Sequence, residues 1–114
     1  MCDKSVLDEI TSRVCAAAKE VLGDKLEKVI LFGSYARGDY DEESDIDIMV
    51  IADIALEEAN GVSNKIHDVT GDIGLEYDVL VSLSVDSSDI FHKYKDHSGF
   101  YINVQKDGVQ LYAA

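Results

Sequence analysis

The sequence predicts an α/β (α+β) domain in which helical segments alternate with short strands. Apolar residues recur every three or four positions within residues 5–22 and again within 54–69, which is typical of amphipathic helices. Short apolar runs at about 26–32, 45–51 and 75–84 have the length and alternation of strands. With 114 residues, the whole chain is expected to form one domain with a modest single core.

The first helix is predicted to begin at Ser5, which suits the N-cap position, and to stop at Gly23. Cys15 falls inside this helix and is interpreted as a packing residue. Cys2 is interpreted as an exposed thiol near the start of the chain. Two cysteines are too few for a disulfide framework.

The first strand is predicted to stop at Gly33 and Ser34, which have the character of a phosphate-binding turn. Glycine lets the backbone approach a ligand closely. Ser34 offers a hydroxyl and begins a short helix whose free N–H groups would point at an anion. Arg37 is the fixed cation beside this turn. It could contact a triphosphate or pair with the acidic loop that follows, and the sequence does not decide between these roles.

Asp45 and Asp47 open the second strand, ten residues after the Gly-Ser pair. Side chains alternate along a strand, so both carboxylates share one face. Two unpaired carboxylates on a buried strand cost several kcal/mol, roughly, unless a cation sits beside them. Magnesium is the natural candidate because it takes carboxylate oxygens and leaves room for phosphate.

The sequence defines the bounds of the later helices less clearly. Asn60 and Gly61 could split the helix predicted over 54–69, because glycine disfavours a helix interior. Two short helical pieces are expected after the third strand, one from Ser87 onward and one at about 99–105.

The Gly-Ser pair, the spacer and the Asp-x-Asp motif together resemble the signature of the DNA polymerase β-like nucleotidyltransferase superfamily. The fuller match, Gly33-Ser-Tyr-Ala-Arg-Gly38 with Ser44-Asp-Ile-Asp-Ile48, resembles its minimal nucleotidyltransferase (MNT) branch. This resemblance implies a polymerase β palm-like nucleotidyltransferase fold, a mixed β-sheet with helices on one face.

The resemblance also implies a site. Two Mg²⁺ ions would be held by Asp45, Asp47 and a third carboxylate on the third strand, while Gly33 and Ser34 would cradle the nucleotide phosphates. Asp78 maps to the third position, with Glu76 as its competitor two residues away on the same predicted face.

Stand-alone MNT proteins resemble the antitoxin half of HEPN–MNT toxin–antitoxin pairs. The resemblance therefore implies transfer of AMP from ATP to a tyrosine of a HEPN ribonuclease toxin. Two alternatives stay open. One is an antitoxin that neutralises its partner by binding alone, and the other is a nucleotidyltransferase that modifies a small-molecule hydroxyl.

The composition favours a protein partner over nucleic acid. Ten Lys and Arg residues stand against 23 Asp and Glu, giving a net charge of −13. Direct nucleic-acid binding is not expected, because it depends on cationic side chains that neutralise phosphates. A basic protein would complement this charge. No apolar run approaches the roughly 18 residues that span a membrane, and no signal-peptide pattern opens the chain, so a cytoplasmic location is expected.

Overall fold

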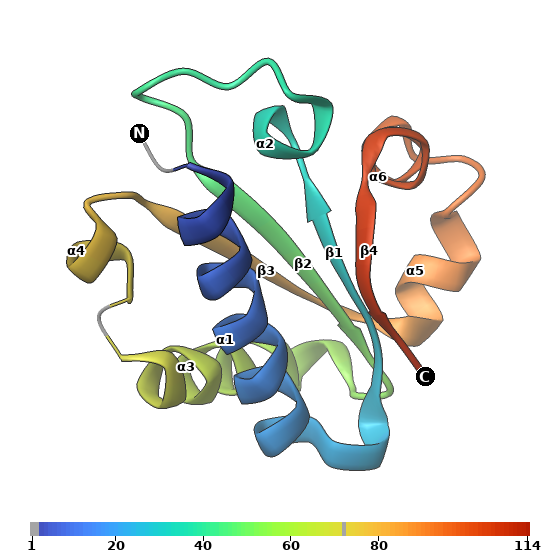
Figure 1. Cartoon of the computed structure of the whole chain (residues 1–114). Helices are drawn as coiled ribbons and strands as arrows, with labels where there is room; N and C mark the ends of the chain where they lie inside the picture. Colours follow the sequence, from blue (N-terminus) through green and yellow to red (C-terminus); the bar gives the residue numbers. More distant parts are fainter. Residues whose placement is uncertain (1–2, 72) are drawn as a thin grey trace.

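The structure is a computed structural model, and it describes residues 3–71 and 73–114 (Figure 1). The interpretation of Cys2 as an exposed thiol therefore falls outside the described residues. The elements follow in the order α1 (Lys4–Leu22), η1 (Gly23–Lys25, a 3-10 turn), β1 (Leu26–Phe32), α2 (Ser34–Arg37), β2 (Ile46–Ala52), η2 (Leu56–Glu58, a 3-10 turn), α3 (Ala59–Thr70), α4 (Ile73–Tyr77), β3 (Val81–Ser87), α5 (Ser88–Tyr94), α6 (Gly99–Asp107) and β4 (Val109–Ala113).

The four strands form one mixed sheet in the order β3-β2-β1-β4. β1 runs antiparallel to both β2 and β4, whereas β2 and β3 are parallel. The register places Asp47 of β2 between Phe32 of β1 and Ser82 of β3. The mixed sheet expected from the sequence is thus confirmed, and its central strands carry the Asp-x-Asp motif.

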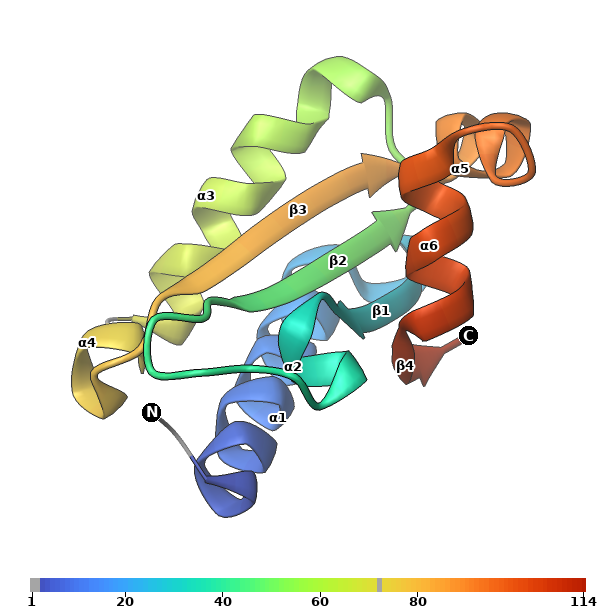
Figure 2. The same ribbon diagram turned by 90° about the horizontal axis from the view of Figure 1, so that it is seen from above.

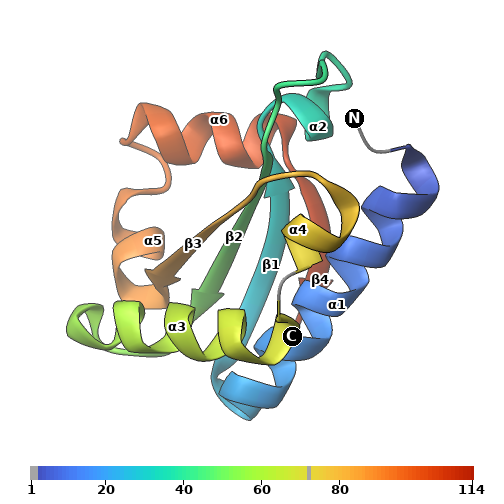
Figure 3. The ribbon, with the colours of Figure 1, turned by 90° about the vertical axis from the view of Figure 1, so that its left-hand side faces the viewer.

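Helices pack against both faces of the sheet, so the expectation of helices on one face is wrong. Ile46 and Ile48 of β2 join a core formed with α1 and α3, while Met49 and Ile51 contact the opposite core around Phe91. Figure 1 shows α1 and α3 on one side of the sheet and α5 and α6 on the other, and Figure 3 is viewed from the side of α1 and α3. β2 is apolar on both faces beyond Asp47, and such a strand needs cover on both.

The start of α1 differs from the prediction by two residues. Asp3 is the N-cap, and its carboxylate accepts a hydrogen bond of 2.9 Å from the N–H of Val6. Ser5 lies inside the first turn instead. The predicted stop is confirmed, because Gly23 adopts φ 55° and its N–H closes onto the carbonyl of Lys19.

Replacing Asp3 with alanine should therefore destabilise the fold by about 0.5–2 kcal/mol, the usual cost of losing an N-cap side chain. Ser5→Ala is the matched control and should not lower stability, since alanine favours a helix more than serine does. Urea unfolding of both variants measures the difference. Equal stabilities would show that the cap makes no net contribution.

The predicted strand over 75–84 is wrong in its first half. Residues 73–77 form α4 instead, and β3 begins at Val81. Long-range contacts fix α4. Ile73 is buried in the core, and Arg13 of α1 donates to Glu76 across 2.8 Å. A few alternating residues fit either one helical turn or a strand, so the local pattern alone did not decide.

The other elements agree more closely with the sequence. β1 has the bounds that were predicted, and the helix expected over 54–69 is present as η2 followed by α3. No helix within the described parts of the chain combines the length and the apolar character needed to cross a membrane.

Candidate functional site

The end of β1 and the start of β2 meet at one edge of the sheet, where α2 contacts both strands (Figure 2). Phe32, the last residue of β1, lies opposite Asp47. Residues directly opposite in an antiparallel pair have Cα atoms roughly 4.5–5.5 Å apart and point to the same face. The Gly-Ser pair that follows Phe32 therefore lies next to the Asp-x-Asp motif. We call Gly33, Ser34, Asp45 and Asp47 the GS–DxD edge.

Gly33 is in close contact with the side chain of Asp47. Its φ of 74° lies in the left-handed region that favours glycine. A Cβ added at this position would collide with Oδ2 of Asp47 and lie 3.3 Å from its Cγ. Any other residue at this turn would therefore require the carboxylate of Asp47 to move.

Ser34 begins α2, a single helical turn. The first donors inside this turn are the N–H groups of Ala36 and Arg37, and both bond to the carbonyl of Gly33 at 3.1 Å. The N–H of Ser34 comes before them, so it is not used within the helix. The turn predicted at Gly33 and Ser34 is therefore present, next to the two aspartates.

Asp47 lies in an unfavourable electrostatic environment. Burial raises the pKa of its carboxyl, the nearby charge of Asp45 raises the pKa further, and Arg37 lowers it. The two carboxylates are thus close enough to repel each other, as the period-two pattern of the strand predicted. Two such oxygen donors, beside a turn that only glycine allows, are suited to a hard divalent cation such as magnesium.

Arg37 pairs with the acidic loop. Its Nε donates to Asp39 Oδ2 at 3.1 Å, and both side chains are about half exposed. Its charge nevertheless reaches Asp47. A guanidinium carries five donors, and this pair uses one of them, so Arg37 can also contact a phosphate. Both roles considered from the sequence are compatible with this geometry.

The expected third carboxylate does not join Asp45 and Asp47 in this structure. Among the residues that the structure describes, no three Asp, Glu, His or Cys side chains are grouped as a metal site. Asp78 is exposed in the turn before β3, at φ 55°, and Glu76 is paired with Arg13. Because α4 replaces the start of the predicted strand, the β3 residue beside Asp47 is Ser82.

The nucleotidyltransferase domain family matches residues 14–110, a span that includes the whole GS–DxD edge. The chain belongs to this family. The match confirms the MNT-type domain indicated by the motif, so the protein is a nucleotidyltransferase.

Two relatives of this nucleotidyltransferase come from Methanocaldococcus jannaschii, and each is named as a candidate protein adenylyltransferase. One is 38% identical over 96 residues, covering 84% of this chain and 88% of the relative. The other is 40% identical over 93 residues, covering 80% and 84%. A crystal structure of a toxin–antitoxin with AMP-PNP has a similar fold, with a TM-score of 0.57 at 22% identity over 91% of this chain and 73% of that chain.

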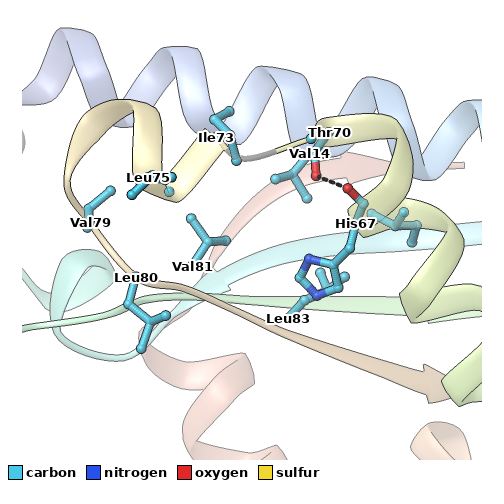
Figure 4. Close-up of a pocket in the computed structure, with 12 residues that line it drawn as sticks. Val14, His67, Thr70, Ile73, Leu75, Val79, Leu80, Val81 and Leu83 are labelled. Carbon is cyan, nitrogen blue, oxygen red and sulfur yellow. Dashed lines mark hydrogen bonds between the residues drawn. The ribbon is translucent and has the colours of Figure 1, made fainter.

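Of two cavities in the nucleotidyltransferase, one lies away from the GS–DxD edge and one adjoins it. One of about 270 Å³ lies among α1, α3, α4 and β3, and mainly apolar side chains such as Val14 and Leu83 line it (Figure 4). None of the described residues lining it is Lys or Arg, and none belongs to the GS–DxD edge. The other cavity, of about 230 Å³, adjoins that edge, with Gly33 and Arg37 on one side and α6 on the other.

The sequence did not predict that α6 would line this cavity or that Ser82 would lie beside Asp47. No motif marks either of them, and α6 follows the Gly-Ser pair by more than sixty residues. The one local hint was the apolar spacing of residues 99–105, which predicted a helix but not its contact with β1.

Proposed function

We propose that this nucleotidyltransferase transfers AMP from ATP to a tyrosine hydroxyl of a HEPN ribonuclease toxin and thereby acts as its antitoxin. The observation that carries the proposal is the pair of carboxylates, Asp45 and Asp47, held against the glycine turn at Gly33. The relatives named as candidate protein adenylyltransferases and the similar fold of a toxin–antitoxin with AMP-PNP support it.

Asp45 and Asp47 would hold Mg²⁺, which when bound supplies positive charge to the phosphate oxygens and favours ionisation of the acceptor hydroxyl. Gly33 leaves room for the triphosphate to approach the backbone, and the N–H of Ser34 can donate to a phosphate oxygen. The guanidinium of Arg37 adds further donors. Positioning and charge stabilisation of this kind dominate phosphoryl-type transfers.

The proposed reaction exchanges a phosphoanhydride bond of ATP for a phosphoester bond to tyrosine. The tyrosine oxygen bonds to the α-phosphorus of ATP, and the bond from that phosphorus to the oxygen bridging the β-phosphate breaks. Pyrophosphate leaves with that electron pair, and the phenolic proton passes to solvent. The products are an AMP-tyrosine and pyrophosphate.

Asp78 remains our candidate for the third carboxylate. The N–H of Ile46, between the two site aspartates, donates to the carbonyl of Leu80 at 2.9 Å. This bond ties the segment that follows Asp78 to the start of β2.

The charge near the site suits a basic acceptor protein. In the loop between α2 and β2, four acidic residues precede Asp45, and all four are exposed: Asp39, Asp41, Glu42 and Glu43. The loop is ordered locally, because Ser44 Oγ accepts the N–H of Asp41 at 2.9 Å. A basic ribonuclease would be steered toward this loop, and its association should weaken as salt increases.

Co-expression with the toxin followed by intact-mass spectrometry tests the proposal. Each AMP transferred should add about 329 Da to the toxin, the group that nucleotidyl transfer from ATP leaves behind. Asp45→Asn should keep the complex but lose the added mass. Asp53→Asn removes the same charge at the far end of β2 and should modify the toxin normally.

Two results would contradict this proposal in different ways. A toxin that stays unmodified yet is fully neutralised by the Asp45→Asn variant would indicate an antitoxin that acts by binding alone. Magnesium-dependent transfer to a small-molecule hydroxyl, with none to the toxin, would indicate the other alternative.

A further inference from the structure

The cavity of about 230 Å³ begins directly beside Asp47. Two of its lining residues are neighbours of that aspartate: Phe32 is its partner across the sheet, and Gly33 is packed against its carboxylate. Arg37 of α2 lines the cavity as well. A ligand with phosphates at the GS–DxD edge could therefore place its remaining part in this cavity.

Phe100 of α6 provides an aromatic wall. Its ring contacts Phe32 edge-on, with centroids 5.6 Å apart and planes at 87°, and it lies 5.7 Å from the ring of Tyr101. These contacts fix the ring, yet 50% of the residue stays exposed. Stacking of a base on such a ring strengthens binding by roughly 5- to 150-fold.

Asn103 lines the same cavity one helical turn further on, and residues three apart share a helix face. Its amide offers one acceptor and one donor side by side. This pair matches the amino group and N7 of adenine, whereas guanine presents two acceptors at the same edge. Asp107, four residues later, also lines the cavity and supplies a further acceptor.

The helix that carries these side chains is held firmly on the sheet. The hydroxyl of Tyr101 donates to Asp86 Oδ2 of β3 at 2.9 Å, and Val104 is buried in the core beneath α6. The α6 backbone at Phe100 and Asn103 is therefore in place before any ligand arrives, and the ring of Phe100 is also held against Phe32. Such preorganisation lowers the entropic cost of binding.

We infer that this cavity holds the adenine ring of ATP, with Phe100 against the ring face and Asn103 reading its edge. The inference rests on the proposed function and extends it by naming the residues that select the base. The volume is consistent with this, because pockets that enclose a whole drug-sized ligand measure roughly 300–1,000 Å³. A cavity of about 230 Å³ suits the base alone, with the triphosphate left at the GS–DxD edge.

Titration calorimetry with magnesium and ATP, GTP or inorganic tripolyphosphate tests the inference on the full chain. Phe100→Ala should weaken ATP binding about 10-fold or more, in line with the loss of stacking, and leave tripolyphosphate binding unchanged. Asn103→Ala should reduce the preference for ATP over GTP about 10-fold. The controls are Tyr94→Ala, an exposed aromatic of α5, and Asn64→Ala, an exposed asparagine of α3. Both should bind as the wild type does.

Three outcomes would overturn the inference. Unchanged ATP affinity in Phe100→Ala would show that the base binds elsewhere. If that variant also modified the toxin more slowly, the cavity would instead receive the acceptor protein. A parallel loss of ATP and tripolyphosphate binding would mean that Phe100 only supports the turn at Gly33. A wild-type protein that binds neither ATP nor tripolyphosphate would refute the proposed function together with this inference, so the two failures are distinguishable.

Discussion

Replacing Gly33 with alanine should abolish nucleotidyl transfer, although it adds a single methyl group. The new Cβ would collide with Oδ2 of Asp47, so the carboxylate must move. Displacing a reacting group by about 1 Å can cost 10²-fold in rate, and we expect a loss of at least that size. Gly33→Val should be at least as severe, because its branched side chain would also occupy the space that the triphosphate must enter.

Backbone strain has to be separated from this collision. Gly33 has φ 74° and ψ −155°, a backbone region essentially restricted to glycine, and another residue there costs on the order of 1–3 kcal/mol. Gly23 provides the matched control, because its φ is 55° and nothing lies within 4 Å of an added Cβ. Gly23→Ala should lose similar stability yet transfer AMP normally. Transfer assays well below both melting temperatures make the comparison, and wild-type turnover by Gly33→Ala would show that the close contact is not needed.

The parts of the site that could be predicted are those encoded locally. The bounds of β1 follow from one apolar run that a glycine ends, and the shared face of Asp45 and Asp47 follows from the period of a strand. A spacing of ten residues between two motifs was enough to indicate the family. Each of these signals lies within about twenty residues of sequence.

The parts that were missed depend on contacts between distant segments. Residues 75–80 alternate as a strand would, but Arg13 bonds Glu76 from 63 positions away and helps to fix α4. The position of Phe100 against Phe32 was also not predictable, since the apolar spacing of α6 does not show which strand it covers. The predicted start of α1 was wrong because Asp3 and Ser5 are both good N-cap residues, and the sequence alone does not distinguish them.

Asp47→Asn should separate the proposed catalytic role of this carboxylate from a structural one. Transfer should fall by at least about 10²–10³-fold, the range for removing one group that stabilises developing charge. The metal-free fold should nevertheless be as stable as the wild type or more so, because asparagine has a similar shape and removes the repulsion from Asp45. Magnesium with ATP should raise the melting temperature of the wild type more than that of the variant, since a ligand stabilises the state that binds it.

The stability difference between the wild type and Asp47→Asn should depend on pH in a direction that the pKa shift of Asp47 sets. Burial and Asp45 raise the pKa of Asp47 in the folded state, so the folded protein holds this proton more tightly than the unfolded chain does. The resulting stabilisation is complete below the unfolded pKa of about 3.9 and is lost as the pH rises through the raised value. Without metal, the wild type should therefore lose stability relative to Asp47→Asn as the pH rises from about 4 to 7, because the unpaired carboxylate becomes charged.

Thermal unfolding of both proteins across this pH range, in the presence of a chelator, makes the measurement. Asp53→Asn removes the same formal charge at the opposite end of β2, so it corrects for the general effect of making an acidic protein less negative. If Asp47→Asn were markedly less stable than Asp53→Asn in the chelator, the carboxylate of Asp47 would be a structural group. We expect the opposite result, namely an Asp47→Asn variant at least as stable as this control without metal. Removing the cation leaves Asp45 and Asp47 repelling each other in the wild type, and the substitution relieves that repulsion.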